Sequence, residues 1–275
     1  MKSEKKVISV ANIIEESRYG GPQARIVSIS HAISDKVMTT VVLPKRDSNR
    51  FSKELDGFKI PYKTFSLSRV SKQPSVLLRY FIFSFIEIVK LTLYFRREKF
   101  DIIHVSGGSW QFKGVIAGKL AGVKVIWHLN DTYAPKAIRI LFYFISRFSD
   151  AFIYASLRSK EYYESLTNKE IPSYIIPAPV DIEKFNPCLN YSKEEASIKS
   201  WEGSTVIGMI ANISPVKSIE TFIKALDIIN KECVNIIFVV IGTHYKSQKK
   251  YLTMLKKMVT NLSVDNIEFI GSVSD

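Results

Sequence analysis

The 275-residue sequence predicts an α/β protein made of two doubly wound units, the second of them incomplete. Three observations predict this fold. Runs rich in Val and Ile alternate with helical patterns along most of the chain, the runs are continuously apolar, and a proline-rich stretch at residues 177–187 interrupts the alternation once. Continuous apolar strands are typical of a parallel sheet that helices cover on both faces.

The first unit is expected to alternate strands and helices. Strands are predicted at residues 7–14, 39–43, 62–67, 101–106, 124–129, 151–155 and 173–176. Helices are predicted at residues 22–34, 75–97, 110–121, 135–149 and 159–167. This order favours one doubly wound domain, which we place at residues 1–178.

The stretch PAPVDIEKFNP (177–187) contains three prolines and predicts a stiff, extended connection. After it the alternation restarts, with strands expected at 205–211, 235–241 and 266–270 and helices at 218–231 and 246–262. This second unit, residues 179–275, is smaller than a usual doubly wound domain of about five or six strands. We therefore expect the chain to be a truncated version of a longer protein.

Composition limits the function classes. Cys188 and Cys233 cannot form a disulfide framework or a cysteine zinc site, which favours a reducing cytosol. The charged residues 1–6 lack the apolar core of a signal peptide. The net charge of +13 suits nucleic acid, an anionic membrane surface or a phosphorylated small molecule. No zinc-finger spacing or RNP-like strand occurs, so charge alone favours nucleic acid, and we expect no nucleic-acid partner.

Two segments are both aromatic and basic. Residues 75–97 carry Arg79, Glu87 and Lys90 inside an apolar stretch, and each charge costs roughly 2.5–3.5 kcal/mol near a bilayer centre. The pattern therefore indicates an amphipathic helix and not a membrane span. Residues 138–148, IRILFYFISRF, are similar. Two interpretations remain open: helices packed on the sheet, or helices that also contact a membrane interface.

A glycine pair, Gly20 and Gly21, separates the first strand from the first helix, with Pro22 at the first helical position. A glycine pair here lets the backbone approach a bound group closely, and the helix N-terminus would face the same place. A simple turn is the alternative. Arg18 and Gln23 break the G-x-G-x-x-G pattern, so we expect no nicotinamide cofactor, and no other cofactor is indicated.

His128 ends a predicted strand, and Asp131 lies in the loop that follows. Ligands of open α/β sheets bind at this edge, so His128 could contact substrate hydroxyls or a developing positive charge. A structural hydrogen-bonding role is the alternative. The four histidines include no H-x-x-x-H pair, so no metal site is expected.

The second unit has a matching junction. Lys217 stands just ahead of a predicted helix, with Ser218 as its N-cap and Glu220 in its first turn. A lysine beside a helix N-terminus makes a pyrophosphate site, while an ordinary surface lysine is the alternative. Gly242 and Gly271 each end a further strand, which favours a cleft along this edge.

Taken together, these segments resemble glycosyltransferase family 4. The glycine pair, HLND, PAPVDIEKFNP, NISPVK and EFIGSVSD follow the order of that family over nearly the whole chain. Asp181, Phe185 and Pro187 match the G-V-D-x-x-x-F-x-P pattern that opens its second domain. The resemblance implies the GT-B fold of glycosyltransferase group 1: a Rossmann-like acceptor-side domain followed by a Rossmann-like domain for the nucleotide-sugar donor.

The resemblance also implies roles for residues. Lys217 matches the lysine of the R-x-x-x-x-K-G donor-phosphate motif, Gly20 and Gly21 match the first-loop glycines near the donor phosphates, and His128 matches a histidine that contacts the donor sugar. The catalytic candidates are therefore His128 and Lys217, the donor or phosphate candidates are Gly20, Gly21, Asn212, Lys217 and Gly242, and the further candidates are Asp131 and Gly271.

Some positions depart from the family pattern. Asn212 stands where the family often has arginine, Ser218 replaces the motif's glycine, and Thr243 and His244 replace the usual D-G. The sequence also contains no counterpart of the family's E-x₇-E stretch, whose glutamates contact the donor sugar and ribose.

The implied activity is a retaining, metal-independent transfer from a UDP- or GDP-linked sugar to a glycan or lipid-linked acceptor in surface polysaccharide biosynthesis. In such a transfer, cations and backbone N–H groups stabilise the departing diphosphate. The expected location is the cytoplasm, with peripheral contact to the inner face of the cytoplasmic membrane. The alternative is a truncated, inactive remnant, or one subunit of a split glycosyltransferase that acts as a binding module.

Overall fold

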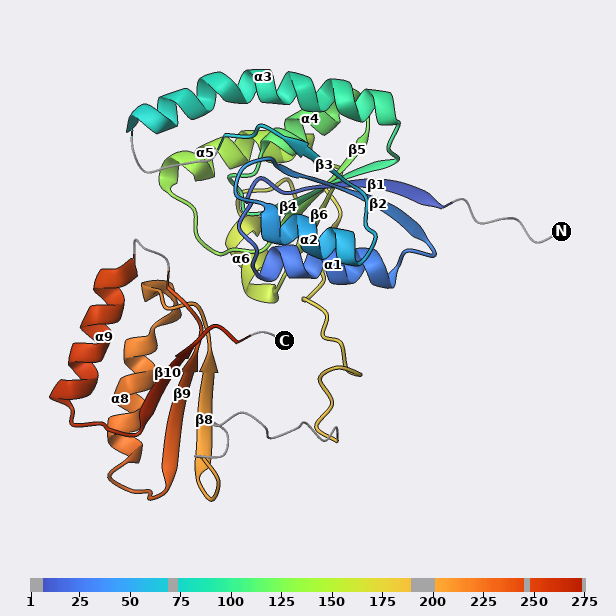
Figure 1. Ribbon diagram of the computed structural model, residues 1–275. Helices are drawn as coiled ribbons and strands as arrows, with labels where there is room; N and C mark the ends of the chain where they lie inside the picture. The colour runs from blue at the N-terminus through green and yellow to red at the C-terminus, as the bar shows by residue number, and fades with distance from the viewer. Residues whose placement is uncertain (1–6, 69–73, 189–200, 245–247, 274–275) are drawn as a thin grey trace. The chain divides into compact units, whose positions relative to one another are not determined.

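The computed structural model describes residues 7–68, 74–188, 201–244 and 248–273. The chain divides into two compact units, Met1–Phe185 and Asn186–Asp275. Each is an α/β unit with its own parallel sheet (Figure 1). The predicted fold class, with a smaller second unit, is confirmed.

Within the described residues, the first unit has a seven-stranded sheet in the order β3-β2-β1-β4-β5-β6-β7. The paired strands all run parallel. The strands are β1 (Ile8–Ile13), β2 (Val37–Pro44), β3 (Tyr62–Phe65), β4 (Ile102–Gly107), β5 (Lys124–Leu129), β6 (Ala151–Tyr154) and β7 (Ser173–Ile175). The chain moves one way from β1 to β3 and the other way from β4 to β7, so the topological switch point lies between β1 and β4. Open α/β sheets bind ligands outside the carboxyl ends of the strands at such a point.

Helices cover both faces of this sheet (Figure 1). The helices are α1 (Gly21–Ala32), α2 (Asn49–Gly57), α3 (Pro74–Glu98), α4 (Lys113–Ala121), α5 (Lys136–Ile145), the 3₁₀ turn η1 (Ser146–Phe148) and α6 (Leu157–Glu164). The helices α1 and α2 lie on one face, and α3, α4 and α5 lie on the other, as right-handed crossovers from the two strand directions require. Continuous apolar strands result because both faces are covered.

Each face has its own core. Under α3, α4 and α5, the buried Trp127 of β5 packs its ring 4.8 Å from that of Phe142, with Leu91 and Val115 in the same cluster. Under α1 and α2, Ile26 packs in a second cluster with buried side chains from β2 and α2. Burying a side chain of this size contributes about 1.5–3 kcal/mol.

Among the described residues, the structure adds the helix α2 to those expected. This nine-residue helix carries only Phe51 and Leu55 as buried side chains, four residues apart on one face. A single turn's spacing of two apolar residues is too short a pattern to separate a helix from a loop.

The helix predicted at residues 110–121 begins three residues late, at Lys113. The backbone amide of Gln111 donates to the carbonyl of Gly108 at 3.0 Å, so a turn occupies the preceding residues. The helix predicted at 159–167 begins early, because Ser156 and Ser159 form a capping box. The first residues of the helix predicted at 246–262 lie outside the described residues, as does the side chain of Arg79.

The proline-rich connection contains no strand or helix, and it includes a turn where a stiff, extended segment is predicted. Within it, Asp181 closes a turn: its Oδ1 accepts from the backbone amides of Glu183 at 3.1 Å and Lys184 at 3.0 Å, and its carbonyl accepts from the amide of Phe185 at 2.9 Å. An aspartate at the start of a turn satisfies amides that no strand or helix would bind.

In the second unit, the described residues form a three-stranded parallel sheet in the order β10-β9-β8. Its elements are β8 (Thr205–Ile210), the 3₁₀ turn η2 (Pro215–Lys217), α8 (Ile219–Ile229), β9 (Ile236–Ile241), α9 (Lys249–Asn261) and β10 (Ile267–Gly271). Both helices pack on one face of the sheet (Figure 1), around the buried Ile223, Val240 and Leu255. On β8, Val206 and Ile210 are exposed.

Candidate functional site

The glycine pair leads directly into α1 at the carboxyl end of β1. Gly20 is the N-cap with extended backbone (φ −166°), no side chain caps the helix, and no acidic residue occupies its first turn. A Cβ at Gly21 would meet no atom within 4 Å, and one at Gly20 would lie 3.7 Å from the nearest atom, in Gln23. Neither backbone strain nor crowding within the unit therefore requires glycine here. The uncapped helix end remains able to receive an anion.

Residues outside the predicted set hold this loop in place. The amide of Glu15 donates to Oε1 of Gln111 at 2.8 Å, and Nε2 of Gln23 donates to the carbonyl of Glu16 at 2.8 Å. The side chain of Gln111 occupies the space beside Gly107, whose φ of +134° favours glycine. The loop after β1 is thus fixed from both the β4 side and the α1 side.

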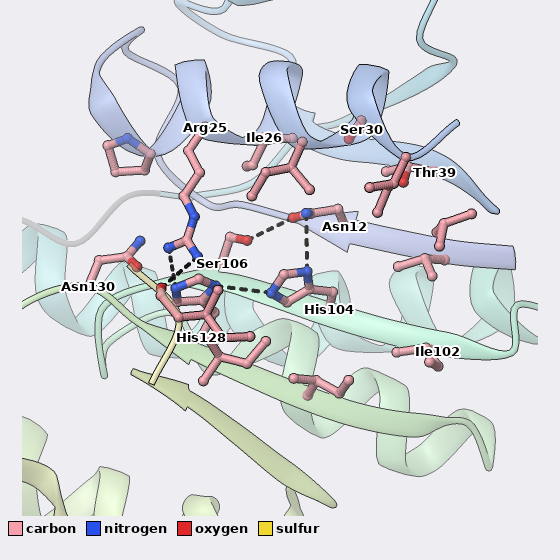
Figure 2. Close-up of a pocket in the computed structure, with 18 residues that line it drawn as sticks. Asn12, Arg25, Ile26, Ser30, Thr39, Ile102, His104, Ser106, His128 and Asn130 are labelled. Atoms are coloured by element: carbon pink, nitrogen blue, oxygen red, sulfur yellow. Dashed lines mark hydrogen bonds between the residues drawn. The ribbon is translucent and has the colours of Figure 1, made fainter. Parts of the chain in front are cut away.

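Next to this loop, a cavity of about 260 Å³ lies between α1 and strands β1, β4 and β5 (Figure 2). Its lining is mostly apolar, with Ile102, Ile126 and Ile153 along the sheet and Ile29 on α1. One part of it is polar and is lined by Asn12, Arg25, His104, Ser106, His128 and Asn130. Figure 2 shows these polar side chains pointing toward one another from β1, β4, β5, the residue after β5 and α1.

His128 lies at the centre of this polar cluster and is 2% exposed. Its Nε2 contacts Nη1 of Arg25, and its Nδ1 lies 3.2 Å from Nε2 of His104. The two imidazole rings stack, with centroids 5.4 Å apart. The other terminal nitrogen of Arg25, Nη2, donates to the carbonyl of Ile176 at 3.0 Å.

The cluster continues to β1. Nδ1 of His104 lies 3.3 Å from the side-chain amide of Asn12, and the hydroxyl of Ser106 donates to the same amide group at 2.8 Å. Burial lowers the pKa of His104 to about 4, with a further contribution from the charge of Arg25. Burial, His104 and Arg25 together lower the pKa of His128 to about 2. Both rings are therefore neutral at pH 7.

Two polar atoms that line this cavity are buried and have no hydrogen-bond partner among the described residues. They are Nε of Arg25 and Oδ1 of Asn130. One is a donor and the other an acceptor, so each could form a hydrogen bond with a hydroxyl group.

Asp131 does not join the cavity, although it is only three residues from His128. Its carboxylate accepts a hydrogen bond from the hydroxyl of Tyr163 and packs so closely on Gly108 that a Cβ there would lie 2.3 Å from Oδ2. Burial raises the pKa of Asp131. The structure therefore gives Asp131 a partner on α6 and separates it from the histidine pair.

In the second unit, the candidate residues follow the carboxyl ends of the three strands. The amide of Ile213 donates to the carbonyl of Thr243 at 2.8 Å, and the amide of Gly242 donates to the carbonyl of Gly271 at 2.7 Å. A Cβ at Gly242 would lie 2.0 Å from the carbonyl oxygen of Ala211, and its φ is +150°. The close approach of β8 and β9 therefore requires glycine at this position.

Lys217 is exposed at the end of η2, directly before α8. Ser218 is the N-cap as expected, but its backbone is left-handed (φ 50°) and its side chain does not cap the helix. Instead, the amide of Ile219 donates to the hydroxyl of Tyr251 at 3.2 Å, and that hydroxyl donates to Glu220. The exposed ammonium of Lys217 is therefore next in sequence to the start of α8, whose first residue, Ile219, is buried.

Comparisons with known proteins follow the division into units. The sequence pattern of Glycosyltransferase Family 4 matches residues 19–184, and that of Glycosyl transferases group 1 matches residues 191–275. The UDP-Gal:alpha-D-GlcNAc-diphosphoundecaprenol alpha-1,3-galactosyltransferase of Escherichia coli is 27% identical over 168 residues. That alignment covers 56% of this chain and 43% of the galactosyltransferase, so the match spans less than half of that relative.

Solved structures show the same fold at low sequence identity. HepE from Anabaena in complex with UDP superimposes with a TM-score of 0.76 at 18% identity, over 97% of this chain and 70% of HepE. A glycosyltransferase from Rickettsia africae superimposes with a TM-score of 0.75 at 14% identity, over 98% of this chain and 69% of that protein.

Proposed function

Because the chain belongs to glycosyltransferase family 4, we propose that it transfers a sugar from a nucleotide-sugar donor to a glycan or lipid-linked acceptor. The observation that carries this proposal is the glycine pair at the start of α1. Its lack of side chains is not explained by the unit's own packing, and it leaves an uncapped helix N-terminus open to an anion. The UDP complex of HepE and the lipid-linked acceptor in the name of the E. coli relative support the two substrate classes.

We assign the residues as follows. Backbone N–H groups near Gly20 and Gly21 and the ammonium of Lys217 bind the donor diphosphate, with Asn212 and Gly242 shaping the second unit's part of the site. His128 contacts the donor sugar. Positive charge and N–H donors of this kind stabilise the negative charge that develops on a leaving diphosphate.

The chemistry we propose is retaining and metal-independent. The bond between the anomeric carbon and the diphosphate oxygen breaks, and the acceptor oxygen bonds to that carbon on the same face. The acceptor's proton passes to the departing phosphate oxygen. The cation in this scheme is Lys217, and the product is a glycoside with unchanged anomeric configuration.

We further propose that the acceptor lies in the cytoplasmic membrane, which the protein contacts from its inner face during surface polysaccharide biosynthesis. The helix α3 exposes Phe85 and Leu93, and α5 exposes Ile140 and Phe144. The exposed Lys136, Arg139 and Arg147 lie on or next to α5. Apolar and aromatic side chains beside basic ones suit an anionic lipid surface. None of the helices in the described part of the chain meets the length and hydropathy needed to span a bilayer.

A donor screen tests the proposed function. The chain is incubated with radiolabelled UDP- and GDP-linked sugars, with and without bacterial membranes, and label in the lipid fraction is measured. We expect transfer from one donor that depends on membranes. Donor binding is measured in parallel by calorimetry. Binding of a donor without transfer would support the alternative of a binding module, and no binding of any nucleotide sugar would contradict the proposal.

A further inference from the structure

The polar groups around His128 form a hydrogen-bond chain whose direction one residue determines. Arg25 contacts Nε2 of His128, and a guanidinium can only donate. Nε2 of His128 must therefore accept, which leaves the proton of a neutral ring on Nδ1. This nitrogen lies 3.2 Å from Nε2 of His104, so it donates there.

The same reasoning continues along the chain. Since Nε2 of His104 accepts, its proton is on Nδ1, which lies 3.3 Å from the amide of Asn12. That amide must then present its oxygen to His104 and its nitrogen to the hydroxyl of Ser106, a 180° rotation of the group. The opposite orientation of Asn12 would place a proton on Nε2 of His128, facing the donor of Arg25. Because the guanidinium of Arg25 can only donate, it is the side-chain amide of Asn12 that takes the rotated orientation.

Among the described residues, none that lines the cavity around His128 carries a negative charge that would favour an imidazolium. The titratable or charged side chains that face it are Arg25 from α1 and His104 from β4, and the other polar side chains of the cavity are Asn12, Ser106 and Asn130. No carboxylate lines this cavity within the described residues. A proton on either ring would place a second positive charge next to Arg25 in a buried site.

Arg25 also reaches beyond the histidines. Its Nη2 donates to the carbonyl of Ile176, the residue just before the proline-rich connection. One guanidinium therefore links the helix that follows the glycine pair, the ring of His128 and the end of the first unit's last strand. This fixes the orientation of the guanidinium from two sides.

We propose that Arg25 is a positioning residue that, with His104 and Asn12, holds His128 as the neutral Nδ1–H tautomer with the lone pair of Nε2 directed at α1. This inference takes from the proposed function only the role of His128 at the donor sugar. In this tautomer, Nε2 accepts a hydrogen bond from a sugar hydroxyl when Arg25 withdraws, and it has no proton to deliver. His128 is then a hydroxyl acceptor and not a general acid.

Nitrogen NMR of the imidazole rings tests the proposal without any donor. The full chain is labelled with ¹⁵N-histidine, and long-range ¹H–¹⁵N correlations are recorded from pH 8 to pH 5, with His128→Gln assigning the signals. We expect His128 and His104 to show the Nδ1–H pattern and to stay neutral over this range. An Nε2–H pattern, or protonation of His128 above pH 5.5, would overturn the proposal.

Variants of Arg25 test the hydrogen bond that sets the tautomer. Arg25→Met removes the donor, and we expect His128 to lose its fixed Nδ1–H pattern and to show the Nε2–H pattern in part. Arg25→Lys keeps a side chain that can only donate and should keep the Nδ1–H pattern. Arg50→Met, at an exposed position on α2, is the matched control and should change neither ring. An unchanged Nδ1–H pattern in Arg25→Met contradicts the proposal, and the wild-type tautomer decides it if the variants do not fold.

Because these spectra involve no nucleotide, they separate the two conclusions. A chain that binds no donor but shows the Nδ1–H tautomer would overturn the proposed function and leave the role of Arg25 intact. A chain that transfers sugar but carries the proton of His128 on Nε2 would overturn the role of Arg25 and leave the proposed function intact.

Discussion

Lys113 at the start of α4 pairs with Glu15, in the loop between β1 and α1, through both its backbone amide and its side chain. The backbone amide of Lys113 donates to Oε1 of Glu15 at 3.0 Å, and its Nζ lies 3.3 Å from Oε2. The same Nζ lies 2.7 Å from Glu87 on α3 and donates to the carbonyl of Ser68 at 2.8 Å. The lysine side chain has no exposed surface, and this cluster joins the loop after β1 to α3 and α4 inside the first unit.

Lys113→Met should destabilise the chain strongly. It removes the ammonium that pairs with two buried carboxylates, which costs about 3–5 kcal/mol. The measurement is the free energy of unfolding from urea titration. Lys119→Met is the control, because this lysine lies on the same helix, is half exposed and is 3.9 Å from Asp150; a change within about 1 kcal/mol is expected there. Equal effects of the two substitutions would show that the buried cluster is not structurally important.

The low pKa of His128 predicts that the free energy of unfolding decreases in mild acid. Its pKa is about 2 in the folded chain against 6.5 for a free histidine, so below pH 6.5 the unfolded chain binds a proton that the folded chain does not. The free energy of unfolding therefore falls by about 1.4 kcal/mol per pH unit from this group as the pH drops from 6.5 toward 4. His128→Gln should remove that part of the slope. His31→Gln, an exposed position on α1, should keep it, and identical slopes in both variants would contradict the assignment.

Substitutions at Gly21 and Gly242 should change the free energy of unfolding by different amounts. Gly21→Val places atoms in open space at a helix start, so the free energy of unfolding should change by about 0.5 kcal/mol or less. Gly242→Ala forces a Cβ to within 2.0 Å of a carbonyl oxygen at a φ of +150°, and it should cost at least about 1–3 kcal/mol. Urea titration of both variants checks this. A destabilised Gly21→Val would mean that the fold, and not a ligand, requires glycine there.

If α3 and α5 contact the membrane, a negative charge introduced on either helix should weaken membrane binding. Phe85→Glu and Phe144→Glu should each reduce binding to vesicles containing phosphatidylglycerol by about tenfold or more, since each removes about 1.5–3 kcal/mol of apolar burial. Vesicle sedimentation measures the bound fraction. Val234→Glu, at an exposed site in the second unit, should bind like the unmodified chain. Undiminished binding of both phenylalanine variants would place the membrane contact elsewhere.

Local chemistry made much of the fold predictable. The start of α1 could be placed from Gly21 and Pro22 because proline in the first turn of a helix has a local cause. The helix α2 could not be, because Phe51 and Leu55 alone carry its apolar pattern. The late start of α4 depends on the side chain of Gln111 reaching the amide of Glu15, a contact between residues 96 positions apart.

The sequence predicted individual residues of the candidate site but not the contacts between them. His128 follows from its place at the end of an apolar run, but Arg25, His104 and Asn12 become its neighbours only through the register of β1, β4 and β5 and the placement of α1. A polar residue that interrupts an apolar strand, as Asn12 and His104 do, is the one signal in the sequence that pointed to them. The burial of Lys113 depends on three elements and left no such signal.

The central claim is that backbone groups at the glycine pair and the ammonium of Lys217 are each needed to bind the donor diphosphate, and calorimetric titration with UDP tests it most directly. We expect UDP to bind, uridine to bind more weakly, and Gly21→Val and Lys217→Ala each to lower the affinity for UDP by about tenfold or more, as loss of a charge-assisted contact does. Lys256→Ala, an exposed lysine on α9, should not change it. UDP that binds no better than uridine, or equally well to all three variants, would contradict the account.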